Sequence, residues 1–287
     1  MMPVERVRSV LADALIDRIA GADADRRRDR ILDAAGPRWF EDGSPIRRVH
    51  GDAAMFVGGL RALLLQLLHP LAIAGVAEYS GYRGDPWGRL QRTSEFLAVT
   101  TFGTASDAEQ AVTRVRGVHE RVRGVAPDGR PFAASDPHLL TWVHVAEVDS
   151  FLTAYQRYGV QPLTPAEADE YVAQTARVAH ALGAEDVPTS QKELAATIAG
   201  YRPELHGTAQ ARDAARYLLL SPPLPLPARP AYATLAAVAV GLLPWWARWP
   251  LRLPWLPIAE ATVVRAVGHT ATGTIRWAMT APPRPAV

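Results

Sequence analysis

A strongly apolar segment, AAMFVGGLRALLLQLLHPLAIAGVA at residues 53–77, places the tightest limit on the fold of this chain. A transmembrane helix needs roughly 20 consecutive apolar residues, but here Arg61, Gln66, His69 and Pro70 interrupt the run. Polar groups within an apolar stretch are typical of a helix buried beside a polar site. The chain must therefore enclose this segment in a core, and 287 residues with 48% hydrophobic side chains can build a large one.

The other local signals are almost all helical. No run of residues alternates convincingly with a period of two, as a half-buried strand would. We expect helices over 106–124, 135–158 and 164–183, because each range begins with capping residues. These are Ser106 with Glu109, Ser135 or Asp136 before Pro137, and Thr164 with Glu167. The sequence thus predicts an all-α fold, a large single-domain helical bundle.

Composition divides this bundle into three stretches. Residues 1–44 are charged and amphipathic, and we expect them to form an N-terminal helical extension. Residues 45–220 form the expected helical core, which carries the unusual polar residues discussed below. Residues 221–287 begin with SPPLPLPARP, which predicts a rigid proline-rich connector to a C-terminal helical layer packed on the core.

Composition also excludes several kinds of site. The chain has no cysteine, which rules out disulfides, thiolate metal sites and covalent haem attachment. Its only lysine, Lys192, is not in a phosphate-binding GK[ST] loop. The net charge is only +2, and no basic-aromatic pattern indicates nucleic acid. We therefore expect no nucleic-acid partner, and any bound metal must be held by histidine, carboxylate or tyrosine.

Two segments bear on localisation. The N-terminus is charged throughout and does not resemble a signal peptide, so we expect a cytoplasmic protein. The later segment 231–257 is too short and too rich in tryptophan and arginine for a span, and suits a membrane interface better. We expect peripheral membrane contact through residues 244–255.

One histidine, His119, lies at the edge of an apolar stripe. At helical spacing its ring points at the core or beside it, where a valine would fit the pattern. A histidine in such a place is more often a hydrogen-bonded core residue than a metal ligand, so position alone does not assign His119 a role. The stripe consists of Ala108, Ala111, Val112, Val115, Val118 and Val122.

A second group of polar residues lies in DPWGRLQRTSEF. Arg89, Arg92 and Thr93 are spaced i, i+3 and i+4, so a helix presents two guanidiniums and a hydroxyl on one face. This arrangement suits an anion, although a solvated face or a salt-bridged pair is the default interpretation.

Two further histidines lie in apolar surroundings. His69, in QLLHP, is either a pocket residue or a cap at a helix end. His144, in WVHVAEVDSF, is either a pocket residue or is satisfied by Glu147 or a backbone carbonyl. Unpartnered buried polar groups cost on the order of 1 to 3 kcal/mol each, so both rings need partners.

The order of these pieces resembles one family. GGLRALLLQLLHPLAIAGV, YSGYRGDPWGRLQRT, VRGVHERVRG and DPHLLTWVHVAEVDSF follow one another as in the haem b oxygenases that include the rubber-cleaving latex-clearing protein and the mycophenolic-acid pathway oxygenase MpaB. The resemblance covers roughly residues 45–250, including the late LLPWWARWPLR. The most specific part is Arg89 with Thr93, followed by the helical His119.

The resemblance implies a haem b pocket inside an all-helical fold. His119 matches the proximal iron ligand of the family, and Arg89 and Thr93 match its polar pair near the haem. Arg89 and Arg92 are candidates for pairing with the haem propionates, and His69 and His144 are further pocket candidates. Residues 45–220 would then be the haem-binding core.

Two departures limit the resemblance. Arg92 stands where the rubber-cleaving branch has a lysine, and Glu78 does not align with that branch's candidate catalytic glutamate. Cleavage of polyisoprene is therefore not implied, whereas oxygen chemistry is.

We thus expect a haem b-dependent oxygenase or oxidoreductase that acts on a hydrophobic small molecule, isoprenoid or lipid-like, with O2 or peroxide. The alternative is a helical haem or lipid carrier or sensor without turnover. A di-iron bundle would need paired Glu-x-x-His motifs, and the sequence has none.

Overall fold

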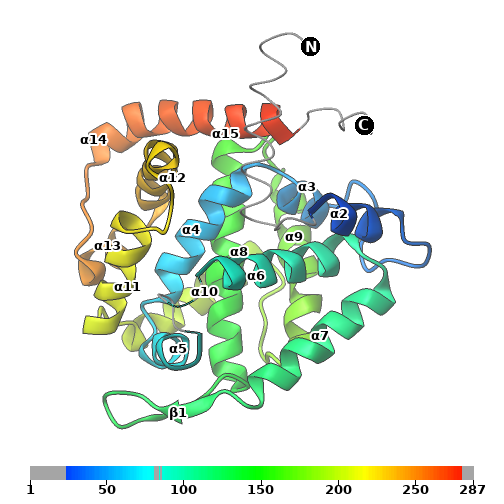
Figure 1. The fold of residues 1–287 in the computed structure, drawn as a ribbon, viewed down its shortest axis with the longest axis horizontal. Coiled ribbons are helices and arrows are strands. Elements are labelled where there is room, and N and C mark those ends of the chain that lie inside the picture. The colour runs from blue at the N-terminus through cyan, green and yellow to red at the C-terminus, as the bar shows by residue number, and fades with distance from the viewer. Residues whose placement is uncertain (1–23, 81–83, 85, 280–287) are drawn as a thin grey trace.

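The computed structural model describes residues 24–80, 84 and 86–279, and the described part is almost entirely helical (Figure 1). Residues 1–23 of the expected N-terminal extension and 280–287 of the C-terminal layer lie outside the described residues, as do 81–83 and 85 of the YSGYRGDPWG motif. The helices, labelled as in Figure 1, are α2 (Ala24–Asp33), α3 (Pro45–His50), α4 (Ala54–Gln66), α5 (Pro70–Gly75), α6 (Pro86–Phe102), α7 (Ala105–His119), α8 (Pro137–Tyr158), α9 (Pro165–Leu182), α10 (Gln191–Tyr201), α11 (Ala209–Leu220), α12 (Arg229–Leu242), α13 (Trp245–Leu251), α14 (Pro257–Ala259) and α15 (Arg265–Met279). Short π or 3-10 turns are η1 (Val76–Ser80), η2 (Arg202–Glu204), η3 (Leu226–Ala228) and η4 (Glu260–Val264). The prediction of an all-α single domain is confirmed.

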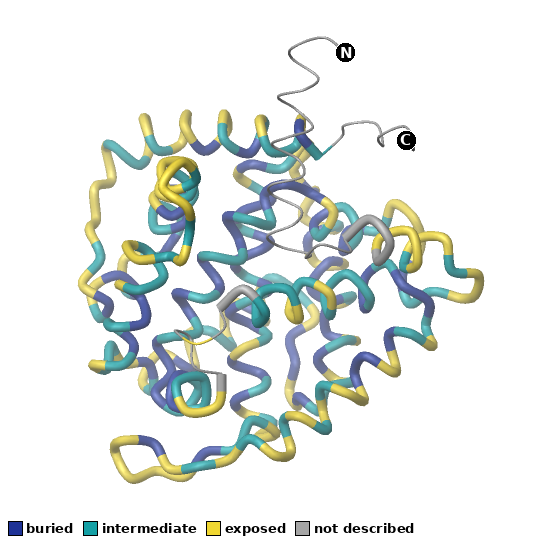
Figure 2. The backbone as a smooth tube through the Cα atoms, viewed as in Figure 1, coloured by how far each residue is buried: buried dark blue, intermediate teal, exposed yellow. Residues whose placement is uncertain are grey.

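The centre of the molecule is the crossing of α4 and α8, the most closely associated helix pair of the described chain. Figure 2 shows buried residues along both helices where they pass through the middle. Leu64 and Leu65 of α4 and Trp142 and Val145 of α8 are fully buried in the main core cluster. The expectation that the apolar segment is a buried helix is therefore confirmed for α4.

Two adjacent glycines of α4 have opposite surroundings. A β-carbon at Gly58 would lie 2.8 Å from Cδ1 of Phe151 and 3.2 Å from the carbonyl oxygen of Ser150, whereas one at Gly59 would meet nothing within 4 Å. Gly58 is therefore the residue that lets α4 approach α8.

We expect Gly58→Ala and Gly59→Ala to change stability in opposite directions. Gly58→Ala should lower the free energy of unfolding by about 1–3 kcal/mol because it overpacks the crossing. Gly59→Ala should raise it by up to about 1 kcal/mol because alanine is the better helix former. Urea unfolding of both variants checks this, and equal effects would contradict the close approach.

The predicted starts of α8 and α9 are confirmed. Asp136 is the N-cap of α8, and its carboxylate accepts from the backbone N–H of His138 at 2.9 Å. Thr164 and Glu167 form the predicted capping box of α9, with bonds of 3.3 and 2.7 Å. Gly183 ends α9 in the left-handed conformation, with φ of 99°.

The bounds predicted for α7 are wrong at both ends. Its N-cap is Thr104 rather than Ser106, and the Thr104 hydroxyl accepts from the backbone N–H of Asp107 at 3.2 Å. The helix ends at His119 rather than Gly124, because the chain then enters a β-hairpin of strands β1 (Arg123–Val125) and β2 (Pro131–Ala133). In its antiparallel register Gly124 pairs with Phe132.

The C-terminal helices form a layer over one end of α4 and α8, with α12 against α4 and α15 against α12 (Figure 1). An ion pair connects α15 of this layer to the core. The Arg276 guanidinium of α15 donates to the buried carboxylate of Asp52 at 2.9 and 3.0 Å, and to the carbonyl of Tyr158 at the end of α8 at 2.8 Å. The proline-rich stretch 221–230 joins α11 to α12 through the turn η3.

No single helix among the described residues is long and apolar enough to cross a membrane. The segments Ala54–Gln66 and Pro70–Tyr79 together have the length and composition of a span, but they are bent by 102° relative to each other.

Candidate functional site

The site is built on a helical hairpin formed by α6 and α7. These helices pack together near Gly103 and Thr104, which join them, and they diverge from that joint in Figure 1. At 1.5 Å per residue, Arg89 and His119 both lie roughly 21–22 Å along their helices from the joint. The hairpin therefore places the two predicted residues at its open end, one on each arm.

His119 is the last residue of α7 and is half-buried. Its Nδ1 atom is inaccessible to solvent and has no hydrogen-bond partner among the described residues. Burial lowers the pKa of the ring, which favours neutral imidazole. A core histidine usually has its buried ring nitrogens hydrogen-bonded, but Nδ1 of His119 has no such bond within the described part of the chain.

The apolar stripe beside His119 is only partly in the core. Ala108, Ala111 and Val112 are buried as expected, but Val115 is half-buried and Val118 is exposed. The first half of α7 packs on the molecule, and the half that carries His119 lies nearer its surface.

Arg89, Arg92 and Thr93 lie in the first half of α6. Arg89 is half-buried, and burial, followed by repulsion from Arg92, lowers the pKa of its guanidinium. Arg92 and Thr93 are exposed. The two guanidiniums are thus close enough to repel each other, which is a favourable setting for an anion that lies between or beside them.

His144 and Glu147 lie on one side of α8, one helical turn apart. The Nε2 atom of His144 is buried without a hydrogen-bond partner among the described residues, and burial lowers the pKa of the ring to about 3. Burial raises the pKa of Glu147 to about 7. No described hydrogen bond joins the two side chains, so Glu147 does not satisfy His144 as the sequence suggested.

We expect Glu147 to make stability depend on pH. The pKa of its carboxyl rises on folding from 4.5 to about 7, so the folded protein holds this proton more tightly than the unfolded chain. The folding free energy contributed by Glu147 is therefore lost as the pH rises through the window from about 4.5 to 7. In urea unfolding, Glu147→Gln should gain stability relative to wild type across this window.

The matched control is Glu109→Gln on the exposed face of α7. It should give the wild-type pH profile of stability. An unchanged profile in Glu147→Gln would show that its carboxyl is not held protonated.

A further polar group was missed by sequence reasoning. His50 of α3 lies 2.8 Å from the Thr101 hydroxyl of α6 through Nδ1 and 3.3 Å from the Tyr171 hydroxyl of α9 through Nε2. Burial lowers the pKa of His50 to about 3. These contacts connect α3, α6 and α9 beside the joint of the α6–α7 hairpin, and no local sequence pattern marks them.

His69 is placed in a different group. It is the N-cap residue of α5, as the capping alternative requires, but its side chain makes no capping bond. The ring is buried beside Trp142 and Tyr201, and its Nε2 lies 3.5 Å from the carboxylate of Glu204. His138 faces the same carboxylate. His69 has no described contact with His119 or His144.

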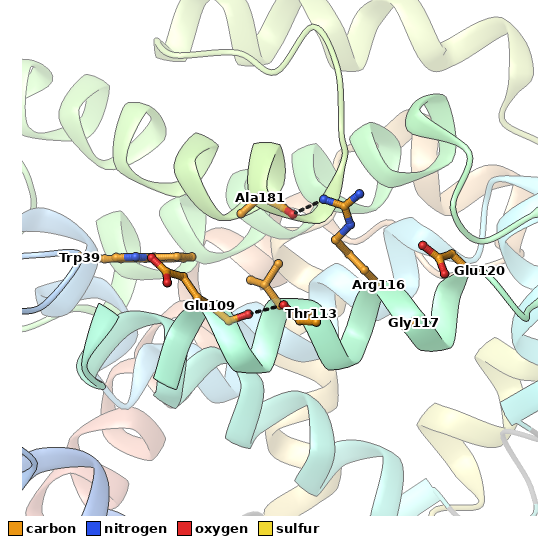
Figure 3. A pocket seen from close by; sticks show the side chains of 8 residues that line it. Trp39, Glu109, Thr113, Arg116, Gly117, Glu120 and Ala181 are labelled. Carbon is orange, nitrogen blue, oxygen red and sulfur yellow. Dashed lines mark hydrogen bonds between the residues drawn. The ribbon is translucent and has the colours of Figure 1, made fainter. Parts of the chain in front are cut away.

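The hollow drawn in Figure 3 lies between α7 and the end of α9 and has a volume of about 420 Å³. Its wall is mixed: Trp39 and Val112 line it together with Glu109 and Glu120, and the Arg116 guanidinium donates to the carbonyl of Ala181 at 3.4 Å. No predicted site residue lines it, nor a second hollow of about 510 Å³ beside Asp149 and Arg265.

Comparison with known proteins supplies the remaining evidence. Residues 47–277 match the family described as ER-bound oxygenase mpaB/B'/Rubber oxygenase, catalytic domain. Two uncharacterised proteins, Mb2261 of Mycobacterium bovis and Rv2237 of Mycobacterium tuberculosis, are each 33% identical to the chain over 112 residues. That match covers 37% of this chain and 43% of each relative, so the chain spans less than half the length of either. No solved structure gives a significant match.

Proposed function

The chain belongs to the mpaB and rubber oxygenase catalytic-domain family, and from this premise we propose that it is a haem b-dependent oxygenase or related oxidoreductase that acts on a hydrophobic small molecule. In this proposal His119 is the proximal iron ligand. The observation that carries the assignment is the Nδ1 atom of His119, which is inaccessible to solvent and has no hydrogen-bond partner among the described residues. The ring itself is half-buried and lies at the open end of the α6–α7 hairpin.

The residues present fit a b-type haem. An imidazole whose pKa is lowered by burial stays neutral and offers a nitrogen lone pair to iron. Arg89 and Arg92, on the opposite arm of the hairpin, are our candidates for pairing with the propionates. The absence of cysteine agrees with non-covalent attachment and histidine ligation.

We assign the roles of the other residues from the family resemblance and from their chemistry. When bound, the haem would supply activation of O2 or peroxide. Thr93, one turn after Arg89, is the hydroxyl donor of the pocket. Glu147, with a pKa of about 7, holds or releases a proton near neutral pH and is our candidate general acid or base. His144 and His69 remain predicted pocket residues.

A second candidate function is a haem carrier or sensor without turnover. The observation that favours it is the second buried, unpartnered imidazole, at His144. If His144 held the iron together with His119, the protein would bind haem without activating O2.

An absorption spectrum of the whole protein, made with added iron and a haem precursor, tests the proposal. We expect a Soret band of high-spin haem, together with either oxygen consumption when a hydrophobic alkene is supplied or oxidation of the haem by added peroxide. A low-spin, six-coordinate spectrum without turnover would favour the carrier. A colourless protein that stays colourless with added haemin would overturn both.

We further propose a cytoplasmic protein that touches membranes through residues 244–255, where apolar substrates partition. Trp245, Trp249 and Trp255 are exposed in and after α13, and Trp249 is 85% exposed. Exposed aromatic rings next to the exposed Arg252 suit the interface of an anionic bilayer.

We expect the double variant Trp249→Ser/Trp255→Ser to bind anionic phospholipid vesicles about tenfold more weakly than wild type, because two large rings no longer leave water. Vesicle co-sedimentation measures this. The exposed Val160, after α8, provides the control variant Val160→Ser, which should bind as wild type does. If the double tryptophan variant bound vesicles as strongly as Val160→Ser, residues 244–255 would not be the membrane contact.

A further inference from the structure

Three metal-ligating side chains from distant parts of the chain converge outside the α6–α7 hairpin. His69 precedes α5, His138 is in the first turn of α8, and Glu204 ends the turn η2. One ligand atom from each residue lies within 4.8 Å of the others. The proposed function keeps His69 as a predicted pocket residue, but neither it nor the family match assigns a role to the three residues as a group.

The distances within the group are those of a ligand set. Nε2 of His138 lies 3.0 Å from both carboxylate oxygens of Glu204, and Nε2 of His69 lies 3.5 Å from one of them. Ligands held 2.0–2.2 Å from a tetrahedral zinc ion stand roughly 3.3 Å apart. The two distances from the Glu204 carboxylate to the imidazole nitrogens, 3.0 and 3.5 Å, therefore fit ligands around a small cation without large rearrangement.

The burial of His69 points to a ligand. Its side chain is only 1% exposed, yet neither ring nitrogen has a hydrogen-bond partner among the described residues, and the contact with Glu204 lacks hydrogen-bond geometry. A buried imidazole with both nitrogens unsatisfied is costly. Coordination through Nε2 would remove part of that cost.

The outer contacts of His138 also suit coordination. The Tyr201 hydroxyl donates to the carbonyl of His138 at 2.7 Å and lies 3.3 Å from its Nδ1. Without a metal, Nε2–H of His138 donates to the Glu204 carboxylate at 3.0 Å. A metal bound at Nε2 would replace that proton, and Nδ1–H would then donate to the Tyr201 hydroxyl oxygen. A partner on the other ring nitrogen is the usual support of a metal-bound histidine.

We propose that His69, His138 and Glu204 bind a divalent transition metal of the zinc class, separate from the haem iron. Two imidazoles and one carboxylate are a ligand set that zinc accepts, with a fourth position left for water. Water can reach the group, because His138 is 54% and Glu204 39% exposed. The ion would join the starts of α5 and α8 to η2, with Tyr201 as a positioning residue.

The test uses full-length, tag-free protein that has been stripped with a chelator and dialysed against zinc, with bound zinc measured by plasma mass spectrometry. Wild type should hold about one equivalent, and His138→Ala and Glu204→Gln should hold none at the same free zinc. His206→Ala removes an exposed imidazole two residues after Glu204 and should bind as wild type does. Tyr201→Phe keeps all three ligands and should bind roughly 10-fold more weakly.

Zinc should also raise the melting temperature of wild type and His206→Ala but not of Glu204→Gln. No zinc in wild type, or as much zinc in Glu204→Gln and His138→Ala as in wild type, would overturn the proposal. His119→Ala should retain zinc, so failure of the haem proposal and failure of this one are distinguishable.

Discussion

His119→Ala protein, purified after growth with a haem precursor, is expected to lack the Soret band that wild type shows. The imidazole is the only protein ligand of the iron in our account. Without it, the haem is bound through its propionates and apolar contacts alone. We expect haem content to fall at least about tenfold at equal protein concentration, measured by the pyridine haemochrome assay.

The control for this experiment is His144→Ala, which removes another imidazole that has a buried, unpartnered nitrogen. It should keep the haem, with at most a change of spin state. Far-UV circular dichroism establishes that both variants are folded. Retention of haem by His119→Ala together with loss from His144→Ala would exchange the roles of the two histidines.

The second large effect is expected at Arg61, in the middle of α4. Its buried guanidinium lies 2.7 Å from the carboxylate of Asp149, donates to the Ser150 hydroxyl at 2.7 Å, and donates through Nε to the carbonyl of Leu242 at 3.0 Å. It therefore connects α4 to α8 and to the end of α12. Arg61→Met fills similar space but leaves these acceptors without a donor.

We expect Arg61→Met to lower the free energy of unfolding by about 3 kcal/mol, the lower end for a broken buried ion pair because Asp149 retains some access to water. Urea unfolding at neutral pH measures it. Arg130→Met breaks an ion pair of similar length, with Asp128, on the surface and should change stability little. Similar losses in the two variants would mean that burial of Arg61 contributes nothing.

The sequence predicted the fold class because its signals are local. The Thr164 and Asp136 caps act within a few residues of themselves, so they are read correctly without tertiary information. The start of α7 was misassigned because two capping patterns overlap, T-x-x-D at Thr104 and S-x-x-E at Ser106, and only the backbone shows that Thr104 is used.

The end of α7 could not be read locally. Gly124 has good helical neighbours, but a β-carbon there would lie 2.6 Å from the carboxylate of Glu78 and 2.8 Å from Phe132. These neighbours come from other segments, and they fit a glycine in a strand of the hairpin. Tertiary contacts therefore overrode the helical pattern after His119.

The site was predicted in part. Family membership followed from motif order and is confirmed, whereas the roles of Arg89, Arg92, Thr93, His119, His144 and His69 stay predictions. The partners of His69 could not be foreseen, because His138 and Glu204 are 66 residues apart in sequence and meet only through the packing of α8 against α10. The raised pKa of Glu147 likewise depends on burial and not on its neighbours in sequence.

Ligand rescue tests the assignment of His119 as the iron ligand most directly. In His119→Gly the imidazole side chain is removed, and free imidazole added to the protein with haemin should restore haem binding and the wild-type Soret band. His144→Gly should bind haem without added imidazole. Haem binding by His119→Gly that equals wild type without imidazole, or a requirement for imidazole in His144→Gly instead, would contradict the assignment.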